Sequence, residues 1–226
     1  MSMNKFFIPT SDPEDWKSLL AEPDKHWKTG YSAKSLAYCW HKANDFPLSV
    51  KRVLEQSKLR IFQDIEMLLA FPEYKVPLPG GRRASQNDIF ILAKGDKQLI
   101  SITVEGKVKE SFGELVCEWK SDKRKGKQIR LNYLCGLLHL DEGQIGYIRY
   151  QLLHRTASAI ILAKRFNAPN ALMLVHSFSQ QGEQENENFQ DYYQFLSLFG
   201  LIGKMNALTP ATDIDGISLY FGWVTE

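Results

Sequence analysis

The hydrophobic positions in the first third of the chain recur every three to four residues. They do so from Ser32 to Trp40 and again from Ser49 to Leu69, and Pro72 ends the pattern. This recurrence is typical of amphipathic helices, and a serine at the start of each segment is a favoured N-cap. The pattern predicts two helices before the first strands, the second of them long.

From Tyr74 onwards the apolar and polar positions alternate, which is typical of strands. Segments 88–93 and 98–105 are separated by Lys94-Gly95-Asp96-Lys97, a tight-turn sequence that predicts a β-hairpin. We expect a third strand over residues 114–119.

Helical spacing returns in the second half of the chain, most clearly over 144–166 and again around 192–199. Segment 171–175 is entirely apolar, as expected for a strand that is buried on both faces, and 217–223 predicts a last strand. The polar, glutamate-rich segment 179–190 predicts a loop. This order of elements predicts an α/β (α+β) fold with a mixed central β-sheet flanked by helices.

The 226 residues are 44% hydrophobic, which is typical of a folded globule. We expect one domain, because the sequence contains neither an internal repeat nor a linker. Within it, 1–48 is an expected N-terminal helical extension, 49–178 the core and 179–226 a C-terminal elaboration.

The three cysteines lie far apart, so they predict neither a disulfide framework nor a zinc knuckle. This spacing is consistent with a reducing cytoplasm. The apolar stretch near the N-terminus is too short for a signal peptide, and runs such as 159–163 are too short to cross a bilayer. We therefore expect a cytoplasmic protein with no membrane partner.

Candidate chemistry lies on the predicted hairpin. Alternation along its second strand puts Glu105 and Lys107 on one face of the sheet. If the turn is centred between Gly95 and Asp96, Asp88 lies opposite residue 103 and is a diagonal neighbour of Glu105, about 7–8 Å away. A one-residue change of register would move Asp88 to the other face.

Two carboxylates at that separation can share one divalent ion. The side chains of Asp88 and Glu105 and the carbonyl of Gly106 are the hard oxygen ligands that Mg²⁺ or Mn²⁺ prefers. Such an ion lowers the pKa of a bound water and polarises a phosphate, and Lys107 would orient that water or stabilise developing charge. The pattern predicts a metal-dependent catalytic cluster.

The three-residue (D/E)-x-K pattern is itself weak, because it occurs four times in the chain. Segments 15–17 and 73–75 lie in or beside expected helices or loops, and 118–120 is a competitor at the end of the third expected strand. Only 105–107 closes a strand whose hairpin partner begins with an aspartate. The alternative interpretation is a set of solvated residues at a sheet edge.

The residues Asn87-Asp88 and Glu105-Gly106-Lys107, followed by a helix and the buried strand 171–175, resemble the PD-(D/E)xK nuclease superfamily. Asn87 stands where the motif's name has proline. The resemblance implies a restriction-endonuclease-like core, a four-stranded mixed sheet between helices, with the matched Asp, Glu and Lys as a metal-dependent phosphodiesterase site. It also implies a further glutamate on the first core helix. Glu66 fits that position as a metal ligand, and Asp64 competes with it.

A polar stripe on the 144–166 helix supports this interpretation. Gln151 and Arg155 follow Tyr147 at four-residue intervals, and side chains of this kind suit hydrogen bonds to a phosphate or to the catalytic cluster. We expect Gln151 to join the catalytic residues and Arg155 to contact nucleic acid, whereas the simpler alternative is a solvated face. His154 and His176 are expected to be structural.

Two basic segments are the expected nucleic-acid contacts. Their residues are Arg82, Arg83, Lys123, Arg124 and Lys125. The total net charge of +2 does not indicate a protein that coats nucleic acid, so affinity must come from such local patches. The expected function is a Mg²⁺- or Mn²⁺-dependent nuclease or nucleic-acid-processing phosphodiesterase. Its partner would be nucleic acid, DNA rather than RNA, and a homo-oligomer is compatible with the sequence. The alternative is a non-catalytic binding or structural module with the same fold.

Overall fold

One mixed sheet of seven strands organises the described residues, 10–226, of this computed structural model. Residues 1–9, on which the expectation of no signal peptide falls, lie outside them. The strand order is β1-β2-β3-β4-β7-β5, with β6 also paired to β7. Strands β1, β2 and β3 are antiparallel, and β3, β4 and β7 are parallel. Their bounds are β1 Glu66–Val76, β2 Ser85–Gly95, β3 Gln98–Lys107, β4 Asn170–Ser177, β5 Ala207–Leu208, β6 Thr212–Ile214 and β7 Ile217–Thr225.

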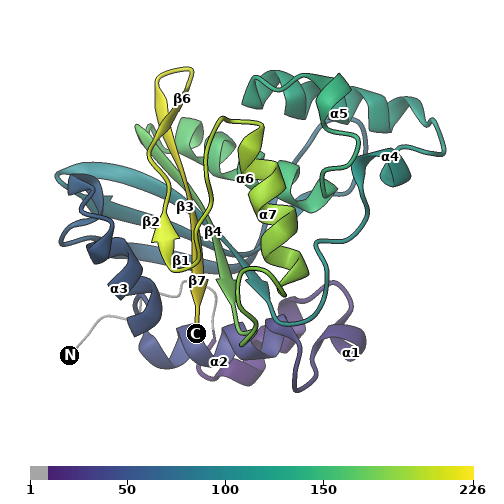
Figure 1. Cartoon of the computed structure of the whole chain (residues 1–226). Coiled ribbons are helices and arrows are strands. Elements are labelled where there is room, and N and C mark those ends of the chain that lie inside the picture. Colours follow the sequence, from purple (N-terminus) through teal and green to yellow (C-terminus); the bar gives the residue numbers. More distant parts are fainter. Residues whose placement is uncertain (1–9) are drawn as a thin grey trace.

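Helices cover both faces of this sheet (Figure 1). Helices α2 and α3 pack on one face, and α5, α6 and α7 pack on the other. The α/β fold with a mixed sheet between helices is therefore confirmed. None of the described helices is long and apolar enough to span a bilayer. The helical bounds are η1 Pro13–Leu19, α1 Pro23–His26, α2 Ser32–Ala43, α3 Leu48–Gln56, η2 Arg60–Phe62, α4 Val116–Trp119, α5 Lys125–Leu138, η3 Glu142–Gln144, α6 Tyr150–Arg165 and α7 Glu187–Ser197.

Alternation along the central strands assigns each residue to one of these faces. Ile89 and Ile91 of β2 belong to the apolar cluster under α2 and α3. Phe90, between them, packs towards Leu162 of α6. Because side chains alternate along a strand, even-numbered positions of β2 and odd-numbered positions of β3 face α6.

The predicted long helix reaching Leu69 is wrong. Helix α3 ends at Gln56, and residues 66–76 form β1. Pro72 does not end a helix but pairs with Ile89 inside β1. Since β1 is the edge strand of the sheet, a proline without an N–H is tolerated there. Short apolar runs do not distinguish a helix from a strand by spacing alone.

The predicted third strand over 114–119 is also wrong. The segment contains the short helix α4, and the Glu118 carboxylate accepts the backbone N–H of Leu115 at 2.9 Å. The neighbour of β3 is instead β4, whose parallel pairing requires a long crossover, here containing α5 and α6. The buried strand predicted over 171–175 is confirmed as β4, and the helix predicted over 144–166 is confirmed as α6 except that it begins only at Tyr150.

The connection between β1 and β2 is tied to α5. Gly80 has a φ of +82°, and a Cβ there would overlap the carbonyl oxygen of Gly126. Arg130 is buried and donates hydrogen bonds to the carbonyls of Pro79 at 2.9 Å and Gly81 at 3.3 Å. The glycine contact and the arginine together fix this loop against the helix.

Replacing Arg130 by Met should destabilise the protein by about 1–3 kcal/mol, because carbonyls beneath the loop lose their donor. Urea denaturation measures the change. Arg124→Met is the matched control: Arg124 is exposed and paired with Asp122 at 3.1 Å, and exposed pairs contribute about 0–1 kcal/mol. Equal losses in the two variants would contradict the anchoring role of Arg130.

Candidate functional site

The register of the β2–β3 hairpin sets the geometry of the site. Gly95 pairs with Gln98, and the two turn residues Asp96 and Lys97 both have positive φ, 41° and 64°. The turn is thus centred one residue later than predicted. Since Ile89 pairs with Val104, the next two positions, Asp88 and Glu105, lie directly opposite each other. The predicted diagonal relation is wrong, whereas the predicted shared face is confirmed, because the pairing shifts by two residues.

Glu105 is buried between two cations. The Lys107 ammonium lies 2.7 Å from one of its carboxylate oxygens, and the Arg155 guanidinium donates to the other. Lys107 also donates to the side-chain oxygen of Gln151 at 3.0 Å. Gln151 and Arg155 of the predicted stripe therefore contact the hairpin residues and are not a solvated face, whereas Tyr147 precedes α6 and is 74% exposed.

Asp88 joins the same cluster from β2. Its carboxylate lies 3.8 Å from the Arg155 guanidinium and accepts the backbone N–H of Gly106 at 2.8 Å. A Cβ on Gly106 would lie only 3.3 Å from the Cβ of Ser32 and 3.4 Å from Leu36, both on α2. A glycine between Glu105 and Lys107 therefore lets α2 pack closely on the opposite face.

Glu73 is the site residue that sequence reasoning missed. Pro72 pairs with Ile89 and Tyr74 with Asn87, so Glu73 lies across from Asp88. Its carboxylate accepts a hydrogen bond from Gln86 at 2.7 Å. Its φ of +52° is uncommon for a non-glycine residue. Recognising 71–76 as an edge strand that contains a proline would have found it.

Glu66 and Asp64, the sequence-based candidates for that additional carboxylate, lie elsewhere. Glu66 is exposed and pairs with Lys94 at the other end of β1. That position is six residues along β2 from Asp88, or about 20 Å at 3.4 Å per residue. The structure does not bring Glu66 to the cluster.

The carboxylates of the cluster have shifted pKa values. Burial, and then the Glu105 carboxylate, raises the pKa of Asp88 to about 7. Burial, and then the Asp88 carboxylate, raises the pKa of Glu73 to about 8. Burial also acts to raise the pKa of Glu105, but Arg155 and Lys107 outweigh it and hold that pKa below its usual value. With all five groups charged, three carboxylates face two cations, so one negative charge is in excess.

The cluster forms the floor of a cavity of about 590 Å³. One wall comes from residues 20–33 and another from residues 110–114. His154 also lines it, where its Nδ1 lies 2.8 Å from the Ser85 hydroxyl. Burial, and then Arg155, lowers the pKa of His154 well below its usual value, so this ring is neutral and has a structural partner.

The two predicted basic segments lie beside each other outside this cavity. Arg82 and Arg83 follow the loop that packs on α5, and residues 123–125 lead into the same helix. All five side chains are exposed and none lines the cavity. Arg155 differs from them, because it is buried and holds carboxylates.

Two clusters within residues 10–226 contain side chains that bind metals elsewhere, and they differ in whether their ligand atoms converge. The oxygens of Glu73, Asp88 and Glu105 do not all lie within 4.8 Å of one another, whereas ligand atoms of Cys39, His176 and Glu226 do. In that second cluster, however, the Trp40 indole donates to His176 Nδ1 at 2.9 Å.

A neutral imidazole that accepts at Nδ1 carries its proton on Nε2. Nε2 of His176 lies 3.0 Å from Glu226, and burial lowers the pKa of this histidine. Its Nε2 therefore donates to Glu226 and has no lone pair for a metal. This cluster fastens the C-terminal residue to the sheet, and His176 is structural, as expected from the sequence.

The protein therefore belongs to the α/β class and has a cavity that contains a cluster of ion-paired carboxylates. Residues 9–226 match the family described as a domain of unknown function (DUF6946), and the chain belongs to that family. No curated protein and no solved structure matches the chain.

Replacing Glu73 by Gln should raise the free energy of unfolding at about pH 8.5 by about 1–3 kcal/mol, the cost of a half-buried charged group without a full complement of partners. The folded protein holds a proton on Glu73 that the unfolded chain releases above its usual pKa of 4.5. Stability from this group is therefore complete at low pH and falls as pH rises through about 8.

Urea denaturation in metal-free buffer at about pH 6 and pH 8.5 measures that dependence. Glu66→Gln is the matched control, because it makes the same change at the exposed end of the same strand. A loss of stability at the higher pH that persists unchanged in Glu73→Gln would contradict the raised pKa.

Proposed function

We propose that this protein is a divalent-metal-dependent phosphodiester hydrolase that acts on nucleic acid, as the resemblance to PD-(D/E)xK nucleases implies. The observation that carries the proposal is the meeting of Asp88, Glu105 and Lys107 on one face of a hairpin, at the floor of one cavity. In hydrolysis a water oxygen bonds to phosphorus as an ester P–O bond breaks, and the leaving oxygen takes a proton.

The donor types suit a hard divalent cation, although the oxygens of the three carboxylates would have to move closer together to share one ion. Asp88, Glu73 and Glu105 offer carboxylate oxygens, the ligands that Mg²⁺ and Mn²⁺ prefer, and the carbonyl of Gly106 is a further candidate. The pKa values of Asp88 and Glu73 are raised, so both carboxylates bind protons more tightly than usual. A bound cation would neutralise the excess negative charge in place of those protons. A bound ion would supply an activated water and polarise the phosphate.

Of the two cations in the cluster, Lys107 acts on the phosphate. Lys107 has its ammonium between Glu105 and Gln151, so its position is fixed before substrate arrives. A preorganised charge of this kind stabilises the negative charge that develops on phosphate oxygens. Arg155 has a different role, because it holds Glu105 and lies beside Asp88. It orients the two carboxylates.

The adjacent basic segments support nucleic acid as the partner. Arg82 and Arg83 together with residues 123–125 form one exposed surface, which we call the basic patch. Clustered lysines and arginines bind phosphates without regard to sequence. In this proposal the basic patch holds the strand while the cavity receives the scissile phosphate.

One observation favours the alternative of a non-catalytic binding module. The Arg155 guanidinium already bridges Glu105 and Asp88, so an ion shared by these carboxylates must displace it. If Arg155 holds that place permanently, the cluster is a structural ion-pair network. A measurement of metal binding distinguishes the hydrolase from the non-catalytic binding module.

Mg²⁺ or Mn²⁺ should raise the melting temperature of the wild type, because a ligand specific for the folded state stabilises it. The shift should grow between about pH 6 and pH 8.5, since the metal competes with protons on Asp88 and Glu73. Asp88→Asn should lose the shift and cleavage together. Lys107→Met should keep the shift and lose about 10²–10³ in cleavage rate.

Cleavage is measured on mixed single- and double-stranded DNA and RNA. Asp64→Asn is the control for Asp88→Asn, because Asp64 is exposed and lies outside the cavity. A wild type that neither shifts with metal nor cleaves any of these substrates would replace the hydrolase by the binding module.

A further inference from the structure

The cavity above the catalytic cluster has a volume of about 590 Å³, the size of a site for a small molecule. A duplex, whose major groove alone is about 12 Å wide, cannot be enclosed in it. The reacting groups lie at its floor, where the side chains of Glu105 and Lys107 are only 3% and 4% exposed. A phosphate that reaches them must enter the cavity, and a whole duplex is too wide to follow it.

The walls of the cavity are fixed to each other by Glu110. Its carboxylate accepts the backbone N–H of Ser32, the first residue of α2, at 2.8 Å. Its backbone carbonyl accepts a hydrogen bond from the Asn188 side chain at 3.0 Å. Residues 110–114 are thus tied to α2 on one side and to α7 on the other, so the width of the cavity is set by the fold.

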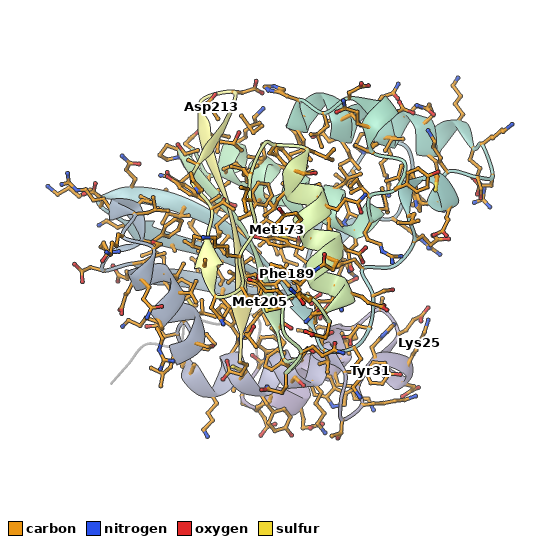
Figure 2. All side chains as sticks on the ribbon, in the orientation of Figure 1. Lys25, Tyr31, Met173, Phe189, Met205 and Asp213 are labelled. Atoms are coloured by element: carbon orange, nitrogen blue, oxygen red, sulfur yellow. The ribbon has the colours of Figure 1, made fainter. Side chains whose placement is uncertain are left out.

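Aromatic and basic side chains line the same cavity. Tyr31 is 40% exposed, and Lys25 lies on the same side of the molecule (Figure 2). On the other side Tyr150 stacks on Trp119 with ring centroids 3.9 Å apart, and the Lys127 ammonium lies 5.2 Å from the Trp119 ring. Trp119 and Lys127 do not line the cavity, but they lie beside Tyr150, which does, and Lys127 is on α5, the helix that begins at Lys125 of the basic patch. Its ammonium is paired with Asp122 at 2.9 Å.

We propose that the substrate is single-stranded nucleic acid, with one nucleotide inside the cavity and its base against the Tyr31 ring. This inference rests on the proposed function and narrows its substrate class. Single strands are bound by cations along the backbone and by aromatic rings on which bases stack. Lys25 and Tyr31 in the cavity, and the exposed basic patch near it, offer both, and the fixed walls exclude a duplex.

Fluorescence anisotropy tests the proposal with labelled oligo(dT), oligo(rU) and the duplex of oligo(dT) with oligo(dA), in Ca²⁺ so that cleavage does not interfere. The single strands should bind more tightly than the duplex. Tyr31→Ala should weaken their binding about tenfold, within the range for loss of one stacked base. Tyr31→Phe should bind like the wild type, since it keeps the ring.

Tyr193→Ala is the matched control, because Tyr193 is 43% exposed on α7 and lines no part of this cavity. Tighter binding of the duplex, or equal binding by all three tyrosine variants, would overturn the inference. Cleavage of duplex alone with Mg²⁺ would overturn it while leaving the hydrolase intact. Absence of both metal binding and cleavage would remove the proposed function itself.

Discussion

The buried Glu105 carboxylate is the group around which this molecule is arranged. An ion taken out of water costs several kcal/mol unless its partners are well placed, and Glu105 is 2% exposed. Lys107 on its own strand and Arg155 on α6 supply those partners. Because one partner lies across the layer boundary, the same contacts that compensate the charge also fix α6 over the hairpin. The same ion pairs therefore determine both the position of α6 and the geometry of the site.

The residues that could be predicted from the sequence are those whose placement follows from local periodicity. Glu105 and Lys107 share a face because strands alternate, and Gln151 and Arg155 share a stripe because helices repeat. The predicted face of Asp88 is correct although the predicted turn centre is wrong. A shift of two residues preserves the face but changes the separation. The predicted turn differs from the observed one because Asp96 and Lys97 adopt positive φ without a glycine at either position.

Other features depend on packing between distant segments and have no local signal. Glu73 lies in the site because segment 66–76 forms the edge strand of the sheet. The spacing of the apolar residues in that segment also fits a helix, so the sequence alone does not place Glu73 there. The two basic segments are separate loops in the sequence. They lie close together in space because Gly80 packs against Gly126 and because Arg130 anchors the β1–β2 loop to α5.

Two clusters of similar residues in this protein differ in what they leave unsatisfied. Around His176, every donor meets an acceptor: Trp40 donates to Nδ1, and Nε2 donates to Glu226. Around Asp88, by contrast, the pKa values of two carboxylates are raised, and Glu73 adopts a positive φ. Strain and uncompensated charge reduce stability and persist where the surrounding structure enforces them, which is characteristic of functional sites. The contrast favours the hairpin and α6 as the place of the proposed chemistry, because the fold maintains there carboxylates with raised pKa values that a cation or a substrate would relieve.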